Sequence, residues 1–169
     1  MAWDPVRQRI VLFGGWDGTL LSDTWEWDGS TWLQRTPVTS PPARSWHVMA
    51  WDAVRQRIVL FGGRGRAGPL SDTWEWDGST WLQRTPVTSP PAREAHAMAW
   101  DAVRQRIVLF GGSGLGGSDT WEWDGSTWLQ RAPVTSPPAR SEHAMAWDVV
   151  RQRIVLFGGS SFDTWLFLP

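Results

Sequence analysis

Residues 49–84 read MAWDAVRQRIVLFGGRGRAGPLSDTWEWDGSTWLQR, and close copies of this segment make up most of the chain. The MAWD motif recurs at spacings of 48, 49 and 47 residues, beginning at Met1, Met49, Met98 and Met145. A proline-rich linker, TPVTSPPAR or APVTSPPAR, separates successive copies. Self-similarity at this period indicates one small structural unit present about four times. We therefore predict a single domain over 1–169, with units at 1–36, 43–85, 92–132 and 139–169.

Each unit is predicted to form four short strands, as the second copy illustrates. Residues 45–51 (SWHVMAW) and 72–76 (DTWEW) alternate between two faces, whereas residues 56–61 (QRIVLF) are apolar on both faces, which suits a covered strand. Asp77–Gly78 favours a two-residue hairpin turn into a fourth strand at 79–84 (STWLQR). No segment has a helical period. This pattern predicts an all-β propeller of four blades, either a complete small ring or part of a larger ring.

The composition excludes several kinds of chemistry. The chain has no Cys and no Tyr, all 16 of its positive charges are arginine, and its formal net charge is −1. Without Cys there is no disulfide framework, no Cys-ligated metal and no thiol nucleophile. The net charge gives no electrostatic reason to expect nucleic acid or a membrane surface as partner. The first apolar run, Ile10–Phe13, is too short for a signal peptide or a membrane span, so the sequence does not assign a compartment.

The pattern RSxHAMAWD…RIVLFGG…DTWEWDGSTW resembles the kelch repeat of many bacterial propeller proteins. The resemblance rests on a diglycine after an apolar strand, followed by aromatic residues on the next strands, and it covers essentially the whole chain. It implies a structural role for the paired glycines Gly14, Gly15, Gly62, Gly63, Gly111, Gly112, Gly158 and Gly159. One departure is that only four residues separate Trp76 from Trp81, where the usual spacing is six, so we expect a shorter hairpin.

The 16 tryptophans require an architectural explanation. They recur at equivalent strand positions, and a propeller blade can bury its faces only against its neighbours. We therefore predict that most of them fill the gaps between blades, with the indole N–H bonded to a carbonyl at the edge. Clear examples are the tryptophans in the predicted fourth strands of the first three units, Trp32, Trp81 and Trp128. A lectin-like aromatic platform for sugars is the alternative interpretation.

Three histidines recur on the first strand, which is the innermost strand of a propeller blade: His47, His96 and His143. Three imidazoles could converge on a metal ion. However, their identical placement and the lack of a repeated carboxylate on that strand favour a structural, hydrogen-bonding role. We predict no metal and no cofactor. The arginines that end the linkers, Arg44, Arg93 and Arg140, are expected to stack on tryptophan and bond loop carbonyls rather than form a cationic ring.

Catalysis is not predicted. No carboxylate pair of the kind that a glycosidase needs stands out from the repeat. The copper oxidases among kelch-type propellers need a Tyr linked to a Cys, and the chain has neither residue. A sialidase-like or sugar-epimerising enzyme, which the kelch resemblance also permits, is one alternative function. An incomplete fragment of a larger kelch protein is another.

Differences between the copies locate a candidate binding surface. The segment after the diglycine reads WDGTLLS, RGRAGPLS, SGLGGS or SSF, whereas the turn DPVRQR, DAVRQR or DVVRQR hardly changes. The variable segments and the residues before the first strand emerge on one face of a propeller, where loops on a rigid scaffold carry binding residues. We predict a non-catalytic scaffold that binds a protein or a glycan through Trp16, Asp17, Arg64, Arg66, Leu115 and Phe162, with Trp46, Glu94 and Glu142 nearer the axis. Drift in unconstrained loops is the competing explanation.

The near identity of the copies also bears on the oligomeric state. A terminal blade should accept a neighbour from another chain as readily as its own opposite end. Two chains could then form a homodimer that closes an eight-blade ring, with self-closure and truncation as the competing interpretations.

Overall fold

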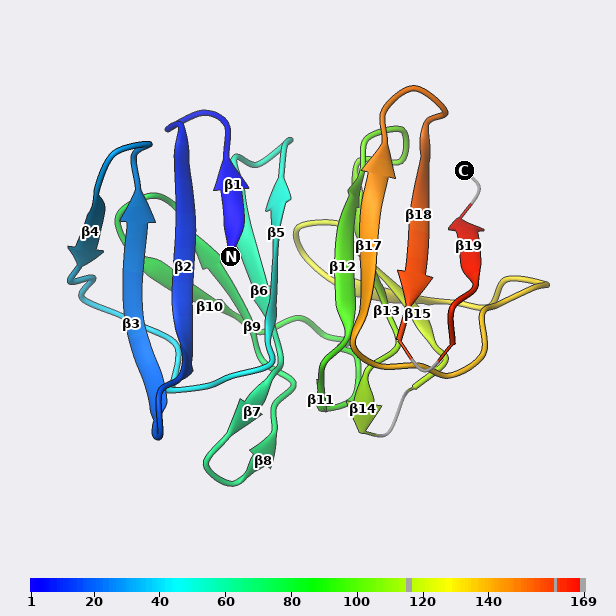
Figure 1. Ribbon diagram of the computed structural model, residues 1–169, viewed down its shortest axis with the longest axis horizontal. Helices are drawn as coiled ribbons and strands as arrows, with labels where there is room; N and C mark the ends of the chain where they lie inside the picture. The colour runs from blue at the N-terminus through cyan, green and yellow to red at the C-terminus, as the bar shows by residue number, and fades with distance from the viewer. Residues whose placement is uncertain (115–116, 160, 168–169) are drawn as a thin grey trace.

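Figure 1 shows the computed structural model of the chain, which describes residues 1–114, 117–159 and 161–167. Four small antiparallel sheets stand side by side as the four blades of a β-propeller, which confirms the predicted fold class. Over these residues, no helix is long and apolar enough to cross a membrane.

Each blade is a meander in which neighbouring strands follow one another along the chain. The first blade contains β1 (Ala2–Asp4), β2 (Arg9–Trp16), β3 (Leu20–Trp27) and β4 (Trp32–Arg35). The second contains β5 (Val48–Asp52), β6 (Arg57–Phe61), β9 (Thr73–Trp76) and β10 (Trp81–Arg84). The third contains β12 (Ala97–Asp101), β13 (Arg106–Phe110), β15 (Thr120–Trp123) and β16 (Trp128–Arg131). The fourth contains β17 (His143–Asp148), β18 (Arg153–Gly158) and β19 (Thr164–Phe167).

Two short ribbons lie at one end of the molecule, at the bottom of Figure 1. One pairs β7 (Arg64–Gly65) with β8 (Gly68–Pro69), and the other pairs β11 (Arg93–Glu94) with β14 (Ser113–Gly114). We call this end, where the loops between second and third strands meet the linkers between blades, the rim.

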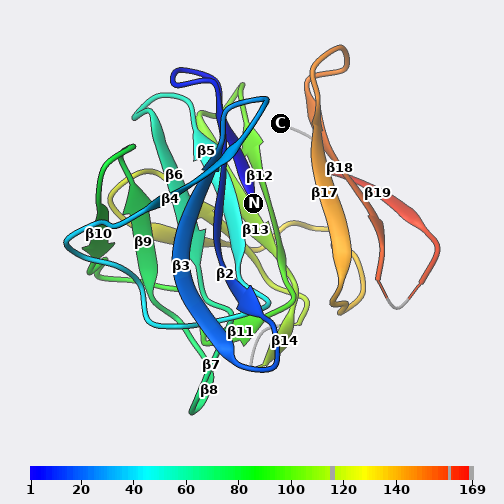
Figure 2. The same cartoon turned by 60° about the vertical axis from the view of Figure 1, so that its left-hand side comes forward.

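The innermost strands of the blades pack against one another in the order β1, β5, β12, β17 (Figures 1 and 2). Within the described residues, no comparable packing joins β17 back to β1. Apolar side chains are correspondingly exposed on the first and fourth blades, including Trp3 and Phe157. The two-chain ring stays a prediction.

The two faces of each blade are different, because side chains alternate across a strand. In the second blade, one face carries Met49, Ile58, Leu60, Trp74, Trp76 and Trp81, and we call it the tryptophan face. The opposite, valine face carries Val48, Ala50, Val59 and Phe61. The tryptophan face of the second, third and fourth blades packs on the valine face of the blade before it. These three interfaces form the core.

Indole N–H groups cross these interfaces to side-chain oxygens of the preceding blade. The Nε1 atoms of Trp81 and Trp128 donate to the hydroxyls of Thr24 and Thr73, each at 3.0 Å. The expectation of carbonyl acceptors was therefore wrong for these two residues. Strand carbonyls already bond within their own sheets, whereas a threonine hydroxyl on the facing blade is available as an acceptor.

The predicted two-residue turn at Asp77–Gly78 is also wrong. Trp76 pairs directly with Trp81, which leaves a loop of four residues between them. The Asp77 carboxylate accepts hydrogen bonds from the backbone N–H groups of Ser79 and Thr80 at 2.8 and 2.9 Å. An aspartate that bonds the backbone two and three residues ahead favours this wider loop and delays the start of the fourth strand.

Glycine is required at both positions after the second strand. Gly62 has φ +59°, and a Cβ atom there would lie 2.7 Å from the carbonyl oxygen of Arg93. Gly63 has φ +95°, and a Cβ atom there would lie 2.7 Å from the Cβ atom of His47. The diglycine thus allows the chain to pass closely between the first strand of its own blade and the next linker.

A buried arginine at the end of each linker ties that linker to the following blade. Arg93 donates through Nη1 and Nη2 to the Asp119 carboxylate at 2.6 and 2.8 Å. Its Nη1 also bonds the Gly111 carbonyl at 3.0 Å, and its Nε bonds the Pro91 carbonyl at 3.1 Å. The carbonyl bonds were predicted, but the aspartate was not singled out from the sequence.

The same arrangement recurs for Arg44 with Asp72. Burial alone would raise the pKa of Asp72, but hydrogen bonds and the charge of Arg44 lower that pKa below its ordinary value. The aspartate is therefore ionised at neutral pH and balances the buried guanidinium.

Candidate functional site

The rim is held by backbone hydrogen bonds between each loop and the linker that leads to the next blade. Gly15 N donates to Arg44 O at 2.9 Å, and Arg44 N donates to Leu21 O at 3.0 Å. The second blade repeats this pattern, because Gly63 N bonds Arg93 O at 2.9 Å and Arg93 N bonds Leu70 O at 3.0 Å. Loops fixed in this way present their side chains from a rigid frame.

A cleft of about 1070 Å³ opens on the rim between the first and second blades. Four residues that the sequence comparison singled out line it together: Trp16, Trp46, Arg64 and Arg66. Its apolar lining includes Leu20 and Leu70, which the sequence analysis missed. The signal that could have identified Leu70 is a leucine at the same repeat position in both loops, since Leu21 is its equivalent in the first blade and Leu20 is the neighbour of Leu21. We call this feature the rim cleft.

The two indoles of the rim cleft are exposed. Trp16 is 65% exposed and Trp46 is 53% exposed, whereas the repeated tryptophans of the blade interfaces are largely buried. Trp46 also has φ +59°, a left-handed backbone conformation that is costly for a tryptophan. Exposed, rigid aromatic side chains of this kind provide much of the binding energy in protein interfaces.

The backbone at Trp46 is held by a chain of hydrogen bonds between equivalent residues of successive blades. The carbonyl of Trp46 accepts from Ala95 N at 2.9 Å, and the carbonyl of Ala95 accepts from Glu142 N at 2.8 Å. Both partners also have positive φ angles, 55° for Ala95 and 59° for Glu142. The surrounding structure thus maintains this uncommon conformation in three blades.

Positive charge dominates the rim cleft. Arg64 Nη1 forms an ion pair with Glu94 Oε1 at 2.9 Å, and its side chain is largely exposed. Arg66 is also exposed and makes no ion pair within the described residues. The cleft therefore combines one guanidinium without a carboxylate partner, one shared with Glu94, and two exposed indoles.

The other predicted rim residues do not line this cleft. Asp17 accepts hydrogen bonds from the backbone N–H and the hydroxyl of Thr19, both at 3.1 Å. Glu142 and Phe162 are exposed on the fourth blade. Leu115 lies outside the described residues.

The three histidines lie between blades rather than in the rim cleft. Each packs edge-on against a phenylalanine of the preceding blade, in the pairs Phe13–His47, Phe61–His96 and Phe110–His143. Neither ring nitrogen of His96 has a hydrogen-bond partner among the described residues, so at this position the role is packing. Across the same residues, no three potential ligands among His, Cys, Asp and Glu gather in a way that could hold a metal ion.

Burial of His96 should make stability depend on pH. Burial first, and then the positive charge of Arg93, lower the pKa of His96 to about 3. The unfolded chain binds a proton at an ordinary histidine pKa of about 6.5, so acidification below that value favours unfolding until the folded pKa is reached. We expect the free energy of unfolding of His96→Leu to fall about 2 kcal/mol less than that of the wild type between pH 7 and pH 5. Urea denaturation at both pH values measures this difference, and equal losses would contradict the assignment.

Comparison with models of known protein families finds no match to this chain, and no curated protein matches it either. The rim cleft places aromatic and apolar surface beside positive charge.

Proposed function

We propose that the protein is a non-catalytic binding scaffold of the kelch type, whose rim cleft binds an extended acidic segment of a protein partner. The kelch assignment is supported by the repeated diglycine and its close backbone approach. The binding assignment is carried by one observation, the convergence of Trp16, Trp46, Arg64 and Arg66 from loops of two blades.

The composition of the cleft favours this occupant. The indoles of Trp16 and Trp46 and the side chain of Leu70 offer apolar contact, and tryptophan and arginine are the residues that most often dominate binding energy. Arg66 can form a bidentate pair with an incoming carboxylate. At about 1070 Å³, the cleft is at the upper end of small-molecule sites, which suits a peptide segment.

Two other functions are less well supported. A neutral glycan would use the indoles but would offer no charge partner to the Arg66 guanidinium, which makes no ion pair within the described residues. A sialidase-like or sugar-epimerising enzyme would need an acid and a base facing the cleft. The carboxylate that reaches the cleft residues, Glu94, is instead bonded to Arg64.

A selection from a displayed library of random peptides tests the proposal. We expect enrichment of sequences that combine acidic and apolar residues, with binding reduced at least about tenfold by Arg66→Ala and by Trp16→Ala. Arg151→Ala is the matched control. That exposed arginine lies in the turn between β17 and β18, at the end of the fourth blade that is away from the rim. No enrichment, binding unaffected by the rim substitutions, or binding to a glycan array alone would overturn the proposal.

A further inference from the structure

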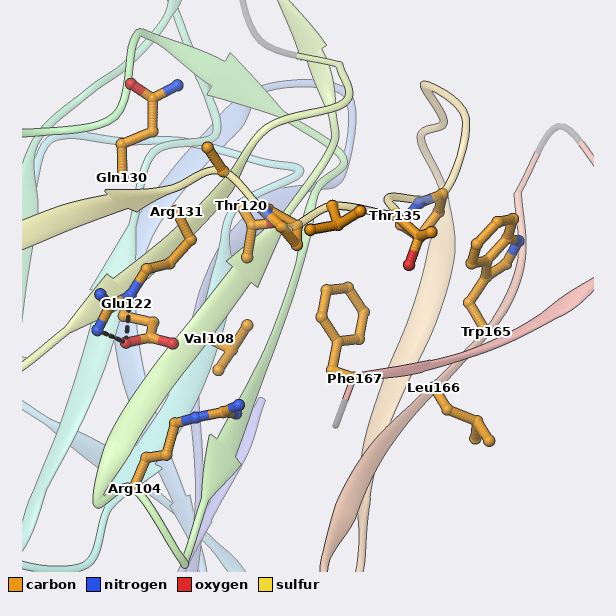
Figure 3. Close-up of a pocket in the computed structure, with 14 residues that line it drawn as sticks. Arg104, Val108, Thr120, Glu122, Gln130, Arg131, Thr135, Trp165, Leu166 and Phe167 are labelled. Atoms are coloured by element: carbon orange, nitrogen blue, oxygen red, sulfur yellow. Dashed lines mark hydrogen bonds and ion pairs between the residues drawn. The ribbon is translucent and has the colours of Figure 1, made fainter. Parts of the chain in front are cut away.

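A second cavity, of about 680 Å³, lies between the third and fourth blades (Figure 3). Val108 of β13 and Thr120 of β15 line one side, and Trp165 and Phe167 of β19 line the other. Thr135, from the linker that follows β16, completes the lining. We call this cavity the outer seat, because it lies beside the outermost strand of the fourth blade.

The equivalent position between the second and third blades is filled by a fourth-strand tryptophan. Trp128 Nε1 donates to Thr73 Oγ1 at 3.0 Å, and Thr88 Oγ1 of the preceding linker donates to the Trp128 carbonyl at 2.5 Å. The Trp128 ring packs against Phe61, with 5.1 Å between the ring centroids. Trp81 makes the same set of contacts between the first and second blades.

The outer seat retains the receiving groups for such a tryptophan. Thr120 is the repeat equivalent of Thr73, and Thr135 is the equivalent of Thr88. Thr120 is only 5% exposed, yet its Oγ1 has no hydrogen-bond partner within the described residues. Among the described residues, none forms a strand on the outer side of β19. A buried hydroxyl without a partner is costly, so its presence points to a missing donor.

We propose that the outer seat binds an extended peptide segment, supplied in trans, whose sequence matches the fourth strand of the repeat, Thr-Trp-Leu-Gln-Arg. The segment adds to the free edge of β19 as a new antiparallel strand. Its tryptophan enters the cavity and donates to Thr120 Oγ1. The interfaces within this chain indicate this occupant, because the fourth strand of the repeat fills the same position twice.

The register of the incoming strand follows from the second blade. There Trp76 is opposite Trp81, and Glu75 is opposite Leu82. In the fourth blade, Phe167 and Leu166 stand at the positions of Trp76 and Glu75. The incoming tryptophan therefore lies opposite Phe167, and the incoming leucine lies opposite Leu166.

Replacement of glutamate by Leu166 changes the specificity of the seat. Within the second blade, Arg84 of the fourth strand forms an ion pair with Glu75 at 2.6 Å. Leu166 offers no charge to the corresponding arginine of an incoming segment. The tryptophan should therefore be essential for binding, and the arginine should be dispensable.

Fluorescence anisotropy with the full chain and a labelled peptide tests this proposal. The peptide has the sequence of residues 77–88, DGSTWLQRTPVT. We expect saturable binding that weakens at least about 30-fold when the peptide tryptophan is replaced by alanine, as for a central interface tryptophan. Replacement of the peptide arginine by valine should change affinity by less than about threefold, because an exposed charge without a partner contributes little.

Two matched threonine variants of the chain locate the site. Thr120→Val should bind the peptide several-fold more weakly without loss of stability in the free chain, because its hydroxyl has no partner to lose. Thr73→Val should destabilise the chain, because Thr73 accepts the bond from Trp128, and it should leave peptide affinity unchanged. The proposal is overturned if the peptide does not bind, if the tryptophan-free peptide binds equally well, or if Thr120→Val leaves the affinity unchanged.

Discussion

Trp128→Ala is expected to lower the free energy of unfolding by about 3–5 kcal/mol, the range for removal of a large buried aromatic side chain. The side chain is fully buried, packs against Phe61 and bonds the Thr73 hydroxyl. Its removal leaves a cavity between two blades and also leaves that hydroxyl without its donor. Urea denaturation followed by circular dichroism measures the loss.

Trp32→Ala is the internal control for this experiment. Trp32 and Trp128 lie in the same local sequence, WDGSTWLQR, but Trp32 is 43% exposed, because none of the described residues forms a blade that packs against that face of the first blade. We expect its replacement to cost less than about 1.5 kcal/mol, since much of its apolar surface already faces water. Equal losses for the two variants would show that the tryptophans stabilise their own hairpins rather than the interfaces between blades.

Arg93→Ala is expected to cost about 3–5 kcal/mol, because it removes one partner of a buried ion pair and leaves the other. Asp119 would lose two charge-assisted hydrogen bonds, and the Gly111 and Pro91 carbonyls would lose one each. The linker between the second and third blades would no longer be anchored. Chemical denaturation at neutral pH gives the measurement.

Two further variants separate the buried charge from the rest of the side chain. Arg93→Met combined with Asp119→Asn should recover part of the loss, because the double change leaves no uncompensated buried charge. Arg151→Ala, which breaks the exposed pair with Asp148, should cost no more than about 1 kcal/mol. A loss for Arg93→Ala as small as that for Arg151→Ala would contradict a structural role for the buried pair.

The fold could be predicted because the repeat carries its own signals. The repeat period, the alternation of side chains between the two faces of a strand, and the diglycine all indicate a propeller blade. Each of these signals can be read directly from the order of residues in the chain. The turn at Asp77–Gly78 was predicted wrongly because the Asp77 side chain, rather than backbone preference alone, decides the loop. Local patterns describe a strand well but do not show which side-chain oxygen will cap a turn.

The candidate site was only partly predictable. Variation between copies singled out Trp16, Trp46, Arg64 and Arg66, but not the fact that these four residues share one cleft. That depends on how the loops of two neighbouring blades approach each other. Sequence comparison also grouped Phe162 with them, although Phe162 lies on the fourth blade and does not line the cleft.

The amino-acid sequence alone determined the repeat, the four-bladed all-β architecture and the side of the propeller on which the copies differ. It could not distinguish Trp32 from Trp128, because the residues around both are the same. Only the tertiary structure separates them, since burial of a blade face requires a second blade in contact with it. For the same reason, the unpaired hydroxyl of Thr120 became visible only when the fourth blade was placed beside the third.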